Sequence, residues 1–166
     1  GACISDDWAG DAEPGYWRDT NFRVEGPVVA QMQGVFMDNW IQARSSVLHG
    51  EDYFPALEPI GTMTAQFFRS GPKDSAENAR ISYLLAFAAA RKSIRLAHAY
   101  FVPDSLAIDE LVAACQRGVK VEIIVPDKID NFLVKKASRS RWGKLLDAGA
   151  HFYEYQPTLY HCKIMI

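Results

Sequence analysis

The 166-residue sequence lacks three features: an excess of one charge, a long hydrophobic run and a paired set of cysteines. Its 18 Lys and Arg residues nearly balance its 20 Asp and Glu residues, for a net charge of -2. This balance gives no global attraction to nucleic acid, which usually requires a strongly basic face. No run of 18 apolar residues occurs and no signal peptide is visible, which leaves open a membrane anchor elsewhere in a longer protein.

Cysteine is scarce. Cys3, Cys115 and Cys162 are an odd number and do not have the spacing of metal ligands. A disulfide framework or a zinc site is therefore not expected, and a reducing compartment fits best.

What the sequence does have is a hydrophobic content of 49%, enough for one real core in a chain of this length. It begins with Gly1 rather than methionine and ends at Ile166 within a hydrophobic strand. We interpret it as an internal fragment of a longer protein.

Strands and helices alternate in the sequence pattern from residue 61 onward, which predicts an α/β fold with helices packed on a mixed sheet. A strand, a helix and a strand over residues 93–125 predict a parallel crossover. The last two strands are predicted to pair as a hairpin around residues 156–158. The predicted strands are 19–25, 63–68, 93–101, 119–125, 151–155 and 159–166. The first predicted helix begins at residue 27 and ends between residues 44 and 49, and the other predicted helices are 74–92, 104–116 and 131–148.

Apolar spacing predicts which side chains those elements bury. Predicted stripes in the first two helices are Val29, Met32, Phe36 and Trp40, and Ile81, Leu84, Leu85 and Ala88. His98, near the end of a predicted strand, is predicted to be a hydrogen-bonded residue of the sheet, with a role as a ligand as the alternative. His49 is predicted to be a solvated loop residue.

The last eight residues carry the strongest chemical signal. Tyr160, Cys162 and Ile164 indicate a strand, so His161 and Lys163 fall on one face, about 7 Å apart along it. An imidazole nucleophile next to a fixed cation suits a phosphate ester. The alternative is a half-exposed strand whose outward positions happen to be His and Lys.

This His-x-Lys pair resembles the motif of the phospholipase D superfamily, in which an Asp follows Lys after four further residues. Residues 17–27, 99–104 and 117–126 resemble the cardiolipin synthase branch of that superfamily. The Asp of the motif would fall at position 168, after the last residue of this sequence.

The resemblance implies a two-lobed phospholipase D fold with two His-x-Lys motifs that meet between the lobes. Residues 1–49 would be the C-terminal part of the first half-domain, and residues 50–60 a connector. Residues 61–166 would be the N-terminal part of the second half-domain, truncated within its motif.

The resemblance also assigns roles. His161 and Lys163 would be catalytic. Asp19 would match a carboxylate that hydrogen-bonds the histidine of the first motif, which this chain does not contain. A surface or helix-capping role for Asp19, simple packing of the aromatic pair at 100–101, and a plain turn at residues 1–4 remain alternatives. Cys3 stands where Asn is common in the family. The residues implied in substrate binding are Gly1, Cys3, Tyr100, Phe101 and Pro103.

The function implied by the family is phosphatidyl transfer through a phosphohistidine, on a phospholipid such as phosphatidylglycerol, without a metal or any other cofactor. The expected location is the cytoplasmic face of a bacterial membrane, peripheral or anchored by a segment outside this sequence, and the fragment alone is expected to be inactive. One alternative is a nuclease of the superfamily, against which the cardiolipin synthase-like resemblance and the acidic pI of about 6.1 argue. The other is a catalytically silent lipid-surface or interaction module, supported by the basic residues of the predicted helix 131–148: Lys135, Lys136, Arg139, Arg141 and Lys144.

Overall fold

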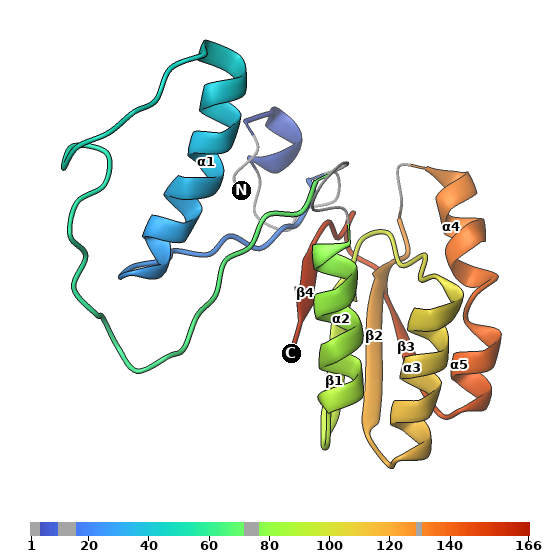
Figure 1. Ribbon diagram of the computed structural model, residues 1–166. Helices are drawn as coiled ribbons and strands as arrows, with labels where there is room; N and C mark the ends of the chain where they lie inside the picture. The colour runs from blue at the N-terminus through green and yellow to red at the C-terminus, as the bar shows by residue number, and fades with distance from the viewer. Residues whose placement is uncertain (1–3, 10–15, 72–76, 129–130) are drawn as a thin grey trace. The chain divides into compact units, whose positions relative to one another are not determined.

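The computed structural model describes residues 4–9, 16–71, 77–128 and 131–166 (Figure 1). It contains two compact units: residues 1–21 together with 81–166, and residues 22–80. The first unit contains the sheet and both residues of the His-x-Lys pair. None of the helices in the described ranges is long and apolar enough to cross a membrane.

The sheet of the first unit has four strands in the order β3-β2-β1-β4. β1 and β2 pair in parallel, β2 and β3 pair in parallel, and β1 and β4 pair antiparallel. The predicted α/β class, the mixed sheet and the parallel crossover are confirmed. The strands are β1 (Ser93–His98), β2 (Lys120–Pro126), β3 (His151–Tyr155) and β4 (Lys163–Met165).

The predicted hairpin of the last two strands is wrong, because β3 and β4 lie at opposite edges of the sheet. β3 pairs with β2, and the chain then passes to the far side of β1. The residues before β4 pair with a distant segment instead. The backbone N–H of Arg18 donates to the carbonyl of Leu159, and that of His161 donates to the carbonyl of Arg18, both at 2.8 Å.

The helices of this region are α2 (Asn78–Ala89), α3 (Ser105–Gln116), α4 (Phe132–Arg139) and α5 (Gly143–Asp147). α3 starts as predicted, with the Asp104 side chain accepting the N–H of Ala107 at 2.8 Å. The single helix predicted over 131–148 is interrupted. The Ser140 hydroxyl donates to the carbonyl of Ala137, and such a side-chain bond competes with the helical ladder.

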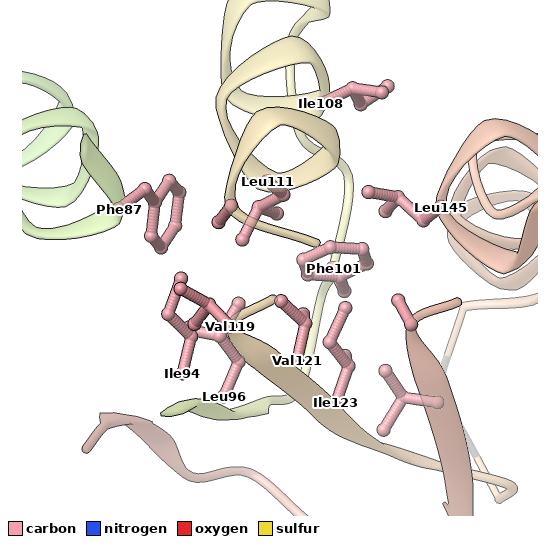
Figure 2. Packing of buried hydrophobic residues seen from close by; sticks show 13 residues of the cluster. Phe87, Ile94, Leu96, Phe101, Ile108, Leu111, Val119, Val121, Ile123 and Leu145 are labelled. Atoms are coloured by element: carbon pink, nitrogen blue, oxygen red, sulfur yellow. The ribbon is translucent and has the colours of Figure 1, made fainter. Parts of the chain in front are cut away.

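The core lies between one face of the sheet and the helices α2, α3 and α5 (Figures 1 and 2). Alternate residues of the strands point into it, as expected for a period of two. The buried side chains that Figure 2 labels are Phe87, Ile94, Leu96, Phe101, Ile108, Leu111, Val119, Val121, Ile123 and Leu145.

The buried stripe predicted for α2 is wrong. Phe87 is buried and Tyr83 packs against the same core, whereas Ile81 and Leu85 are exposed. Both stripes have helical spacing, and the one that faces the sheet carries the larger aromatic rings. Aromatic side chains bury more apolar surface than aliphatic ones, which favours this rotation of the helix.

The second unit contains a helix, α1 (Val28–Arg44), close to its predicted position. Met37 is its buried residue, and Phe36, from the predicted stripe, is exposed. The strands predicted at 19–25 and 63–68 are wrong: both segments are irregular, and Phe22 and Met63 are exposed. Sequence alternation does not by itself supply the neighbouring strand that a ladder requires.

Candidate active site at the carboxyl end of the sheet

The His-x-Lys pair lies where β1 ends. His98 is the last residue of β1, and its cross-strand partner is Lys163, the first residue of β4. Because β1 and β2 are parallel, their carboxyl ends lie at the same end of the sheet. Ligands bind at this end of the strands in open α/β folds. β4, which runs antiparallel to β1, begins at this end of the sheet.

Asp19 reaches His161 through backbone pairing. Arg18 forms an isolated parallel bridge with Tyr160, which places the next residue of each segment side by side. A second contact fixes the same pairing, since the Thr20 hydroxyl lies 3.1 Å from the Cys162 sulfur and Cys162 is fully buried. Two residues 142 positions apart in sequence are thereby brought together.

The imidazole of His161 is held by this carboxylate. His161 Nδ1 lies 3.1 Å from Asp19 Oδ2, and both side chains are mostly buried, with 23% and 20% of their surface exposed. Burial alone would raise the pKa of Asp19. The hydrogen bonds from His161 and from the Thr20 N–H outweigh burial and hold that pKa below its ordinary value. An ionised Asp19 keeps a proton on His161 Nδ1 and leaves the lone pair on Nε2.

Lys163 lies against the same imidazole. Its Nζ is 2.9 Å from His161 Nε2 and 3.1 Å from Nδ1, and it donates to the His161 carbonyl at 2.7 Å. The structure therefore places the two side chains together on one side of the chain, as the period of two predicts. The ammonium group also lies 5.7 Å from the centre of the Tyr100 ring.

Aromatic rings surround His161. The ring centres of Trp8, Tyr100 and Trp17 lie 5.2, 5.8 and 6.1 Å from the imidazole centre, and the two tryptophans are 5.1 Å apart. Such packing restricts the orientation of the imidazole. Neither tryptophan is among the site residues that the sequence analysis names. For Trp17 a signal was present, because it stands two residues before Asp19 and so lies on the same side of an extended segment.

The residues predicted to bind substrate do not all lie at this site. Tyr100 contacts His161, as described above. Phe101 does not belong to a pocket wall: it is 6% exposed, lies in the core and packs edge-on against Phe152, because the next residue along an extended chain faces the opposite way. Pro103 is partly buried in the loop before α3. Gly1 and Cys3 lie outside the described residues.

His98 was missed as a member of this site. Its ring has a backbone hydrogen bond with Tyr100, as expected for a sheet residue, but its Nδ1 is buried and has no hydrogen-bond partner among the described residues. Burial lowers the pKa of His98, and the nearby charge of Lys163 lowers it further. The imidazole is therefore neutral at pH 7.

The arrangement of Asp19, His161 and Lys163 is suited to attack on, or proton transfer at, a phosphate ester. A carboxylate orients the imidazole, Nε2 carries the reactive lone pair, and an ammonium stands beside it to bind phosphoryl oxygens. The model of the family described as cardiolipin synthase, phospholipase D-like domain, matches residues 83–166. The chain belongs to the phospholipase D superfamily, in its cardiolipin synthase-like branch.

Curated relatives carry the same family name. The probable cardiolipin synthase YwiE of Bacillus subtilis is 37% identical over 153 residues, which cover 92% of this chain and 30% of that protein. The major cardiolipin synthase ClsA of Bacillus subtilis is 34% identical over 166 residues, covering 98% of this chain and 34% of the relative. The chain thus spans about a third of the length of these phosphatidyltransferase-family proteins.

A solved structure is also similar. It is the phospholipase D family member Nuc from Salmonella typhimurium, 27% identical, with a TM-score of 0.41. The match covers 47% of this chain and 49% of Nuc.

Asp19→Asn should destabilise this chain in a pH-dependent way. The pKa of Asp19 is lowered in the folded state, so its stabilisation is complete above the unfolded value of about 3.8 and is lost as the pH falls through the folded value. At pH 7 we expect a loss of about 1 kcal/mol in the free energy of unfolding, and a smaller difference from wild type below pH 3.8. Urea unfolding at several pH values measures this.

Asp109→Asn is the matched control, because Asp109 is exposed and its Oδ1 forms an ion pair, at 3.8 Å, with Nζ of Lys144, which is also exposed. Exposed ion pairs contribute little, so this variant should unfold like wild type. Equal stability losses for the two variants at every pH would contradict the proposed bond between Asp19 and His161.

Proposed function

We propose that the protein containing this chain transfers phosphatidyl groups between alcohols through a covalent histidine intermediate, with His161 and Lys163 in the reacting centre. The observation that carries the proposal is the contact series from the Asp19 carboxylate to His161 Nδ1 and from His161 Nε2 to the Lys163 ammonium. The cardiolipin synthase names of the relatives support the class of substrate.

Two imidazoles complete the reaction. One attacks the phosphorus of a phospholipid, a P–N bond forms, and the P–O bond to the leaving alcohol breaks as the second imidazole gives that oxygen its proton. The acceptor alcohol then loses its proton to the second imidazole and attacks the phosphohistidine, which breaks the P–N bond. His161 supplies one imidazole, and a second His-x-Lys motif outside this chain supplies the other. This chain alone is therefore inactive.

Lysines supply the positive charge at phosphorus. An ammonium beside the nucleophile neutralises the phosphoryl oxygens as charge shifts in the transition state, a role that a metal ion fills in other enzymes. We therefore propose that transfer proceeds without a metal or another cofactor.

A phospholipid such as phosphatidylglycerol is the proposed donor, and the proposed location is the cytoplasmic face of a bacterial membrane. The test is a transfer assay with the full-length protein on phosphatidylglycerol vesicles in EDTA. Formation of a lipid with two phosphatidyl groups is expected. Hydrolysis of DNA with no reaction of lipid would favour the nuclease alternative, and binding without turnover would favour a silent module.

The first turn of α4 is the proposed contact with the bilayer. α4 follows β2, so it starts near the carboxyl end of β2, the same end of the sheet as His161. Phe132 and Leu133 are 64% and 75% exposed there, and the Lys136 ammonium lies 4.6 Å from the Phe132 ring centre. This combination of apolar and basic side chains suits the headgroup region of an anionic membrane.

The basic residues of the predicted helix do not all serve that surface. Lys135 pairs with Asp127 at 2.7 Å, and Arg139 pairs with Glu154, within the protein. Lys136 and Arg141 are exposed. The charge available to a membrane is thus smaller than the run of basic residues suggests.

Replacing Phe132 and Leu133 together with serine should weaken binding of this chain to phosphatidylglycerol vesicles by about tenfold or more, because two apolar side chains no longer enter the bilayer. Sedimentation with sucrose-loaded vesicles measures the partition coefficient. Leu146→Ser is the control. Leu146 is exposed on α5, and α5 precedes β3, so it ends near the amino-terminal end of that parallel strand, opposite the end where His161 lies. Equal binding by the double variant and the control would contradict this orientation.

A further inference from the structure

His98 shares a face of the sheet with the reacting pair. It is the register partner of Lys163 in the antiparallel β1–β4 pair, and directly opposed residues point to the same side. His161 lies two residues before Lys163, so it points to that side as well. A third nitrogen base thus stands beside the imidazole and the ammonium of the proposed centre.

The buried Nδ1 of His98 has an unmet hydrogen-bonding capacity. Among side chains in the described part of the chain, it is the one buried nitrogen or oxygen atom without a partner. Buried polar groups are nearly always satisfied, and an exception calls for a functional or structural reason. Here the neighbouring residue across the strand pair is the Lys163 of the proposed centre.

Nδ1 of His98 is an acceptor. Burial and the charge of Lys163 keep this imidazole neutral, and its hydrogen bond with the Tyr100 backbone favours a proton on the ring. Since Nδ1 is without a partner, that bond uses the other ring nitrogen, and the lone pair of the neutral ring falls on Nδ1. The group that suits such an acceptor is an ammonium.

Lys163 cannot remain where it is during the reaction. Its Nζ lies 2.9 Å from Nε2 of His161, the atom whose lone pair would attack phosphorus or take a proton. An ammonium at that distance holds this lone pair in a hydrogen bond. For Nε2 to react, Lys163 has to move to other acceptors.

We propose that His98 is a positioning residue for Lys163: its Nδ1 accepts the ammonium when a phosphate diester enters, so that Lys163 binds the phosphoryl group and releases Nε2 of His161. Lys163 then has a phosphoryl oxygen and His98 Nδ1 as acceptors in place of the His161 ring. This inference rests on the proposed function and names the device that prepares its nucleophile.

The test compares His98→Leu and His98→Asn in the full-length protein. Leucine fills the space without an acceptor, whereas the asparagine carbonyl oxygen can take the place of Nδ1. We expect His98→Leu to lower kcat for phosphatidylglycerol by roughly 10–100-fold with little change in KM, and His98→Asn to stay within about threefold of wild type. His151→Leu, at the exposed start of β3, is the matched control and should leave both constants unchanged.

A spectroscopic measurement separates this inference from the proposed function. In full-length protein labelled with 15N-histidine, orthovanadate should shift the His98 Nδ1 signal toward that of a hydrogen-bonded acceptor, whether or not lipid turns over. Loss of transfer in every variant and in wild type, with this shift present, refutes the transferase but supports the positioning of Lys163. An unshifted His98 signal, wild-type kcat for His98→Leu, or equal losses for the leucine and asparagine variants would overturn the inference.

Discussion

Replacing His161 with alanine should abolish phosphatidyl transfer by the full-length protein and leave the fold intact. The imidazole supplies Nε2. Its loss removes one of the two imidazoles that the proposed reaction needs, one to attack phosphorus and one to transfer the proton. Loss of such a group in enzymes with covalent intermediates costs roughly 10⁴-fold or more in kcat. The fold should survive because the side chain lies at the strand end among Trp8, Trp17 and Tyr100 rather than in the core.

The measurement is transfer from phosphatidylglycerol in EDTA, with circular dichroism to check folding. His151→Ala is the matched control, because His151 is an exposed histidine at the opposite edge of the same sheet. His49→Ala is a second control, because His49 is an exposed residue of the second unit. Both should transfer at the wild-type rate, and near wild-type turnover by His161→Ala would remove His161 from the mechanism.

Lys163→Ala should lower kcat by roughly 10²–10³-fold, the effect of removing one donor that stabilises transition-state charge. The ammonium stands 2.9 Å from His161 Nε2, where it is placed to reach a phosphoryl oxygen after a small movement. The effect should appear mainly in kcat, because the interaction strengthens as charge develops. Steady-state kinetics on mixed micelles of phosphatidylglycerol separates kcat from KM.

Lys92→Ala is the control for the loss of one positive charge. Lys92 is exposed and directly precedes β1, so it lies at the end of that strand opposite to His98. It should change neither constant by more than about twofold. A Lys163→Ala variant whose KM rises while kcat is unchanged would mean that Lys163 only holds the substrate.

The parts of the fold that depend on local patterns could be predicted. Ile94 and Leu96 alternate with less buried neighbours, and Val121 and Ile123 do the same, so the buried face of β1 and β2 follows from the sequence. The same period of two places His161 with Lys163. The cap at Asp104 is likewise a signal of a few adjacent residues.

Features that depend on distant partners could not be predicted. The segment before β4 pairs with Arg18 rather than with β3, and no local pattern distinguishes these partners. Asp19 was expected near the site from family resemblance, but the strand predicted around it does not form, because the pairing stops at one bridge. The unsatisfied Nδ1 of His98 depends on packing from several elements, so no sequence pattern signals it.

The covalent intermediate itself is the most direct test of the account. Full-length protein is mixed with phosphatidylglycerol labelled at phosphorus, in EDTA, and quenched within one turnover in alkali, which preserves a P–N bond, or in acid, which breaks it. We expect label that survives alkali, is lost in acid and maps to a histidine of a His-x-Lys motif. Label on a serine or a carboxylate, or transfer that ceases in EDTA, would contradict it.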